Sequence, residues 1–144
     1  MPREILLGVE IHAGAASIVE AVTTKEGLSS FWVSTSIAEP EAGTEARFTF
    51  QGAPVPLRMR VDRIEPNEVA WTCLGEFPHW EGTTVTWSLE PGPEHGGTRL
   101  LFRHAGFSDA QTEWEFASVS YTWGTILERL KQLAETGSAR PALG

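Results

Sequence analysis

The sequence is poor in three features, and each shortage excludes a class of protein. Cys73 is the single cysteine in 144 residues, so the chain has no internal disulfide and no cysteine cluster for a metal. Lys and Arg number 11 against 19 Asp and Glu, and the net charge of -8 disfavours nucleic acid as a partner. No stretch approaches the roughly 20 consecutive apolar residues of a membrane span, and no secretory leader is recognisable. We therefore expect a cytoplasmic protein without a membrane span.

Aromatic residues, by contrast, are abundant. Six Trp and seven Phe are more than a minimal core of this size needs, and large aromatic side chains commonly line ligand cavities. The chain length suits one domain, and no internal repeat is visible. Residues 138–144 are rich in Ala, Pro and Gly, which predicts a flexible tail after a single domain of residues 1–137.

Alternation of apolar and polar residues predicts about seven strands. They cover approximately 4–12, 33–38, 44–51, 55–65, 69–73, 83–89 and 98–104. The alternation slips at Ile64, which indicates a β-bulge near Asp62 and Arg63 that would bend the sheet. Between two of these strands, the loop 75–82 carries Phe77 and Trp80, and aromatic side chains in a loop raise the question of function.

Helical spacing takes over in two places. Residues 15–31 predict two short helices, the second of which would begin at a capping box formed by Thr23 and Glu26. Apolar residues at intervals of three and four predict one long amphipathic helix over about 112–136. Thr112 with Glu115 forms a second capping box, and Gly137 is a natural stop. At about 1.5 Å per residue, such a helix can cross a whole sheet.

Three segments carry a resemblance to a known family: EAVTTKEGLSSFW at 20–32, GTRLLFRHAGF at 97–107 and WGTILERLKQLAETG at 123–137. With the order of strand, two short helices, six strands and long helix, the chain resembles the helix-grip superfamily, also called START-like or SRPBCC. Within it, the chain is similar to the activators of the heat-shock protein 90 ATPase. The resemblance implies an α+β fold, in which a curved seven-stranded antiparallel sheet wraps around the C-terminal helix and leaves a hollow interior.

Strand parity and this fold together predict which side chains line a cavity between the sheet and the C-terminal helix. The predicted cavity residues are Phe48, Phe50, Met59, Trp71, Cys73, Trp87, Leu100, Phe102, His104, Trp114, Phe116 and Trp123. An aromatic lining with few polar groups is typical of a small-molecule site. The same residues could instead form a densely packed core, and the sequence leaves both interpretations open.

His104 is the best candidate for catalysis, because it shares the inward parity of Leu100 and Phe102. An enzyme would need a second acid or base, which Tyr121 or Glu115 could supply. The alternative is a buried neutral histidine with a structural hydrogen bond. The four histidines show no metal-ligand spacing, and Cys73 is more typical of a small buried hydrophobe than of a nucleophile. We expect neither a metal nor a cofactor.

Three functions are compatible with the sequence. The first is binding of a small apolar or amphipathic molecule, such as a lipid, an isoprenoid or a polyketide-like compound. The second is a cyclase or hydrolase that uses the same cavity, as the wider superfamily implies. The third is a chaperone-associated module of the stress response that docks on a partner protein, as the family resemblance implies. The sequence fits either a monomer or a homodimer.

Overall fold

The computed structural model describes residues 3–77 and 79–143. In chain order, its elements are β1 (Arg3–Ile11), α1 (Ala15–Thr23), α2 (Lys25–Phe31), β2 (Ser36–Ile37), β3 (Glu45–Phe48), β4 (Leu57–Glu65), β5 (Glu68–Leu74), β6 (Thr84–Pro91), β7 (Thr98–Phe107) and α3 (Glu113–Thr136). This is the predicted order of strand, two short helices, six strands and a long helix. The prediction of an α+β helix-grip fold is confirmed.

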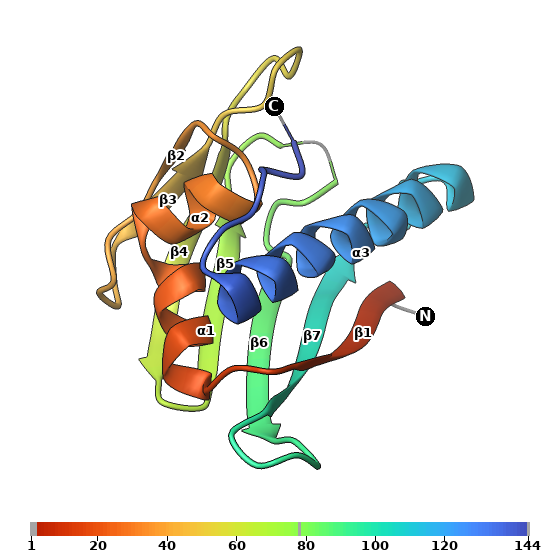
Figure 1. Cartoon of the computed structure of the whole chain (residues 1–144). Coiled ribbons are helices and arrows are strands. Elements are labelled where there is room, and N and C mark those ends of the chain that lie inside the picture. The colour runs from red at the N-terminus through yellow and green to blue at the C-terminus, as the bar shows by residue number, and fades with distance from the viewer. Residues whose placement is uncertain (1–2, 78, 144) are drawn as a thin grey trace.

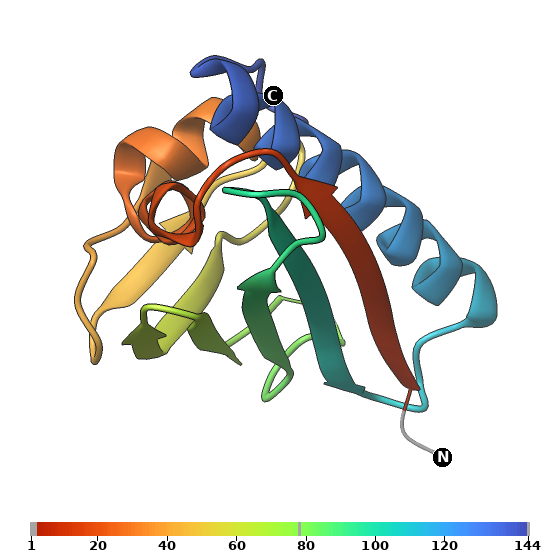
Figure 2. The ribbon, with the colours of Figure 1, turned by 60° about the horizontal axis from the view of Figure 1, so that its bottom comes forward.

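The strands form one antiparallel sheet in the order β1-β7-β6-β5-β4-β3-β2. Its two edges, β1 and β2, are joined by α1 and α2, so the chain crosses the sheet before the meander from β2 to β7 begins. All three helices of the described part lie on one face of the curved sheet, with α3 running across it (Figures 1 and 2). The core lies between that face and the helices.

The predicted bulge is present in β4. The register between β4 and β5 shifts between Val61 and Arg63, so the partners change from Val61–Trp71 to Arg63–Ala70. An extra residue on one strand bends that strand and increases the local twist. The bend curves the sheet around α3, as the break in the alternation of apolar residues indicates.

Both ends of α3 follow the sequence prediction. Thr112 Oγ1 accepts a hydrogen bond from the Glu115 amide, and the Glu115 side chain accepts one from the Thr112 amide, which completes the capping box. Gly137 ends the helix in the left-handed conformation, at φ 85°. One stripe of α3 is buried while the opposite face is exposed. No helix of residues 3–77 and 79–143 has the length and apolar character needed to cross a membrane.

The prediction that Thr23 caps the second short helix is wrong by one residue. Thr23 is the last residue of α1, where its hydroxyl donates to the Val19 carbonyl oxygen at 2.7 Å. Thr24 has the extended backbone that an N-cap requires, and its Oγ1 accepts from the Gly27 amide at 3.1 Å. Two adjacent threonines precede α2, and the cap is taken by the one that lies outside both helices.

The last described residues of the expected C-terminal tail lie against α2 and the residues that follow it. The Ala142 amide donates to the Phe31 carbonyl at 3.0 Å, and the Leu143 amide donates to the Trp32 carbonyl at 2.8 Å. Leu143 also forms a parallel bridge with Val33. Beyond α3 the chain therefore returns alongside α2 (Figure 1). Ala and Pro are common in loose tails, but they also suit an extended segment held by backbone hydrogen bonds.

The two helical glycines should respond in opposite directions to replacement by alanine. A Cβ at Gly27 would lie only 2.6 Å from the Ala21 Cα, because α1 and α2 pack backbone to backbone there. We expect Gly27→Ala to lower the free energy of unfolding by about 1–3 kcal/mol through overpacking. At Gly124 of α3 a Cβ meets nothing within 4 Å. Gly124→Ala should therefore raise the free energy of unfolding by about 0.5–1 kcal/mol, because alanine favours the helix more than glycine does. Urea unfolding measures both, and a gain in stability for Gly27→Ala would contradict the close approach.

Candidate functional site

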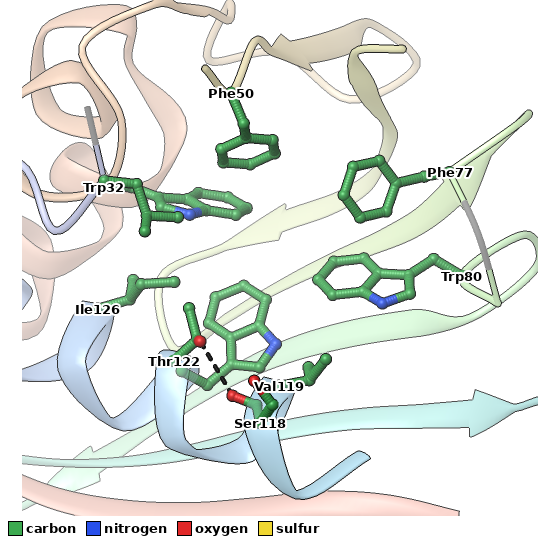
Figure 3. A pocket seen from close by; sticks show the side chains of 10 residues that line it. Trp32, Phe50, Phe77, Trp80, Ser118, Val119, Thr122 and Ile126 are labelled. Atoms are coloured by element: carbon green, nitrogen blue, oxygen red, sulfur yellow. Dashed lines mark hydrogen bonds between the residues drawn. The ribbon is translucent and has the colours of Figure 1, made fainter. Parts of the chain in front are cut away.

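A cavity of about 180 Å³ lies at one end of the space between the sheet and α3. Its walls come from α3, from the loop 75–82 that joins β5 to β6, and from the ends of α2, β3 and the C-terminal segment. It is lined by Trp32, Phe50, Phe77, Trp80, Ser118, Val119, Thr122, Trp123, Ile126 and Leu143 (Figure 3). None of these side chains is ionisable in the physiological range.

Five aromatic rings of the lining form a closed circuit. The centroid of Trp32 lies 6.1 Å from that of Phe50, which lies 5.9 Å from Phe77. Phe77 lies 5.2 Å from Trp80, and Trp80 lies 6.2 Å from Trp123. Trp123 closes the circuit 5.1 Å from Trp32. Each separation is within the range of favourable aromatic pairs, so the rings stabilise one another around the cavity.

Phe50 and Trp123 are the two predicted cavity residues that line this cavity. Eight others fill the interior as core: Phe48, Met59, Trp71, Cys73, Trp87, Leu100, Phe102 and His104, each at most 1% exposed. Their rings pack directly against each other, for example Trp87 and Phe102 at a centroid distance of 5.0 Å. The strand parity is therefore correct, but the centre of the predicted hollow is filled.

The last two predicted residues lie outside the core. Phe116 is half-buried and packs edge-to-face on Phe107 at 5.5 Å, beneath the Arg3 guanidinium. The prediction for Trp114 is wrong, because its side chain is 80% exposed. Trp114 lies in the first turn of α3, on the side of the helix opposite the buried stripe of Trp123, Ile126 and Leu130.

Sequence reasoning missed eight lining residues: Trp32, Phe77, Trp80, Ser118, Val119, Thr122, Ile126 and Leu143. For Phe77 and Trp80 the signal was present, since aromatic side chains are concentrated in the loop 75–82. Val119 and Ile126 lie on the apolar stripe of α3, so their inward direction was predictable. Leu143 gave no such signal, because the docking of its segment depends on backbone hydrogen bonds to residues 31 and 32.

His104 lies beneath the cavity wall in a hydrogen-bonded chain. Its Nδ1 accepts from Trp123 Nε1 at 3.0 Å, so the ring proton must be on Nε2. Nε2 then donates to Thr83 Oγ1 at 2.9 Å, and the Thr83 hydroxyl donates to the Trp80 carbonyl oxygen at 2.6 Å. Both nitrogens of His104 are thus used, and the chain connects two residues that line the cavity, Trp123 and Trp80.

Burial sets the protonation states of the two candidate chemical groups. It lowers the pKa of His104 from 6.5 to about 3, because the imidazolium form would lose its hydration. It raises the pKa of the Cys73 thiol from 9.0 to about 11, so the thiolate is scarce at neutral pH. His104 is therefore a neutral positioning residue, and Cys73 is a buried apolar group. Among the described residues, no group of three His, Cys, Asp or Glu side chains is placed to hold a metal.

The lowered pKa of His104 should make stability depend on pH in a defined window. Between pH 6.5 and about 3 the unfolded chain binds a proton at this histidine that the folded chain does not. The free energy of unfolding should therefore hold its full value above pH 6.5, and below it should fall by roughly 1.4 kcal/mol per pH unit from this group. Urea unfolding at several pH values, followed by Trp fluorescence, measures this slope.

The matched variant is His104→Gln, whose amide keeps one donor and one acceptor but does not titrate. Its unfolding free energy should decline less steeply with falling pH than that of the wild type. The difference between the two slopes should correspond to about one bound proton. Carboxylates contribute equally to both proteins and cancel in the difference. Identical slopes would show that His104 is not held neutral in the folded protein.

The whole fold has close structural relatives. The Aha1 dimer of Colwellia psychrerythraea is 26% identical, with a TM-score of 0.80 over 94% of this chain and 98% of that one. Protein BH1534 of Bacillus halodurans is 28% identical, with a TM-score of 0.70 over 92% and 97% of the two chains. CalU16 of Micromonospora echinospora is 21% identical, with a TM-score of 0.67 over 97% and 78%, and this likeness concerns the fold alone.

The sequence itself matches a family profile over nearly its full length. Among curated proteins, no sequence relative matches this chain. The family described as Activator of Hsp90 ATPase homolog 1-like protein, however, matches residues 12–135, from the end of β1 to the last turn of α3. The match agrees with the resemblance carried by the three sequence segments. The chain therefore belongs to the family of Activator of Hsp90 ATPase homolog 1-like proteins.

Proposed function

We propose that the protein binds a small, uncharged and mostly apolar molecule in the cavity beside α3. The observation that carries this proposal is the closed circuit of Trp32, Phe50, Phe77, Trp80 and Trp123 around an open volume. A core that served stability alone would gain by filling that volume, because interiors pack to high density. Concave, apolar sites with few polar groups are the usual form of a small-molecule site. A cytoplasmic location is part of this proposal.

The cavity volume limits the ligand. Sites for drug-sized molecules usually measure about 300–1,000 Å³, whereas an apolar cavity of about 150 Å³ holds a single benzene ring. At about 180 Å³, the cavity suits a compound of one or two fused rings. A complete lipid or a long polyketide-like chain could not be enclosed in this volume. Of the ligand classes expected from the sequence, we therefore favour small cyclic compounds.

The geometry gives little support to an enzyme built on His104. The imidazole is neutral, both of its nitrogens are bonded within the protein, and it is not among the cavity-lining residues. The two residues considered as a second acid or base do not support an enzyme either. Tyr121 is 80% exposed, and the Glu115 carboxylate accepts the hydrogen bond of the capping box of α3. A general acid or base must reach the reacting atom, and none of the three lines the cavity.

A chaperone-associated role is the second candidate, and the family match supports it. The Aha1 dimer of Colwellia psychrerythraea is similar to this chain over nearly all of both lengths. Function resides in sites rather than in folds, so this likeness needs a direct test. A pulldown that enriches a chaperone ATPase, with stimulation of its turnover, would favour this role over ligand storage. Light scattering on the purified protein distinguishes a monomer from a homodimer.

Filling the cavity should abolish ligand binding without unfolding the protein. Val119 lies half-buried at the cavity wall on α3, so the Val119→Trp side chain can occupy the open volume. With naphthalene as the probe, we expect the wild type to bind and the variant to lose at least about tenfold in affinity, since the ring can no longer be buried. Ligand-observed NMR measures this affinity.

The control is Ala117→Trp, which places the same side chain on the exposed face of α3, two residues away and outside the cavity. This variant should bind naphthalene as the wild type does. Circular dichroism establishes that both variants are folded. If the wild type fails to bind naphthalene, or if both variants bind it equally, the cavity is not a ligand site.

A further inference from the structure

The polar atoms of the cavity are few, and they are unevenly placed. Thr122 Oγ1 donates to the Ser118 carbonyl oxygen one turn earlier in α3, at 2.9 Å. Trp123 Nε1 is committed to His104, and Trp32 Nε1 is sealed from water. The remaining indole of the lining belongs to Trp80, which is 8% exposed. Its Nε1 makes no hydrogen bond to residues 3–77 or 79–143 and is not among the sealed atoms.

The position of this N–H is well defined. In Figure 3 the indole nitrogen of Trp80 lies on the ring edge that faces Val119 of α3. The backbone beneath it is fixed, because the Trp80 carbonyl accepts from both the amide and the hydroxyl of Thr83, at 2.9 and 2.6 Å. The ring stacks on Trp123 at 19° and meets the edge of His104 at 4.5 Å. A donor held in this way loses little entropy when it binds an acceptor.

The rest of the lining is mostly hydrocarbon, and its other polar side chains are the hydroxyls of Ser118 and Thr122 on α3. Away from these groups, the walls are formed by Trp32, Phe50, Phe77, Val119, Ile126 and Leu143. Because the N–H of Trp80 is not sealed from water, an apolar ring that covers it without an acceptor would leave it unpaired at a cost in free energy, and a ligand atom that accepts its hydrogen bond avoids this cost. The N–H presents the positive end of a dipole, which disfavours a cationic ligand, and no lysine or arginine lines the cavity to bind an anion.

We propose that the ligand class is a neutral cyclic compound with one hydrogen-bond acceptor, which receives the N–H of Trp80 while the ring system packs inside the aromatic circuit. This inference rests on the proposed binding function and specifies its chemistry. Trp80 sets selectivity among compounds of equal size, and the aromatic and aliphatic walls supply affinity by burial of apolar surface.

Quinoline and naphthalene test this inference, because they share size and shape and differ in one acceptor nitrogen. The wild type should bind quinoline about three- to tenfold more tightly than naphthalene at neutral pH, the usual gain from one satisfied hydrogen bond. In Trp80→Phe an aromatic ring is kept and the donor is lost, so quinoline should bind no more tightly than naphthalene. Trp114→Phe, at the exposed turn of α3, should keep the wild-type preference.

A second measurement covers the case in which Trp80→Phe unfolds. In ¹H–¹⁵N spectra of the wild type, quinoline should move the indole proton of Trp80 further downfield than naphthalene does, while the two probes should shift that of Trp123 by similar amounts. Naphthalene binding without any preference for quinoline would overturn the acceptor inference and leave the proposed function intact. Tighter binding of tetramethylammonium than of quinoline would also overturn it. Failure of all three probes would count against the binding function itself.

Discussion

The hydrogen-bonded chain from Trp123 through His104 and Thr83 to the Trp80 carbonyl fixes the geometry on which the cavity depends. It joins three parts of the fold: α3, β7 and the loop 75–82 with the residue that follows it. The direction of each bond is determined, because an indole can only donate and the Thr83 hydroxyl has one proton to give. A neutral histidine accepts at one ring nitrogen and donates at the other, whereas a protonated histidine can only donate. The chain therefore requires neutral His104, and burial keeps it neutral by lowering its pKa.

The same chain explains why the cavity stays open. Trp80 and Trp123 stack at 6.2 Å, and each is held from below by a hydrogen bond that involves its own indole or its own carbonyl. The Trp123 ring therefore cannot rotate inward without breaking its buried hydrogen bond to His104, at a cost of about 1–3 kcal/mol, while the Trp80 ring is held by its packing on Trp123 and His104. Aromatic packing fills the middle of the helix-grip interior and leaves this edge unfilled.

Most of the fold could be predicted from the sequence, because it follows from local periodicity. The alternation in β4 to β7, the slip near Arg63 and the capping box at Thr112 depend on residues close in the chain, and the structure confirms them. The cavity was less predictable, since it depends on how large rings share a volume. Parity correctly turned Trp71, Trp87 and Phe102 inward, but it could not say that they would pack against one another.

Several of the residues that sequence reasoning missed share a physical cause, which is that they reach the cavity from irregular backbone. Trp80 lies in a loop, Trp32 follows the end of α2, and Leu143 belongs to a segment anchored by hydrogen bonds to the carbonyls of residues 31 and 32. Neither a period of 2 nor one of 3.6 assigns a direction to such side chains. Regular elements supply the rigid frame, whereas loops and chain ends vary more readily. Relatives with this sheet and this helix can therefore differ in the side chains that line the cavity, so the ligand proposed for this chain is argued from its own lining rather than from the family match.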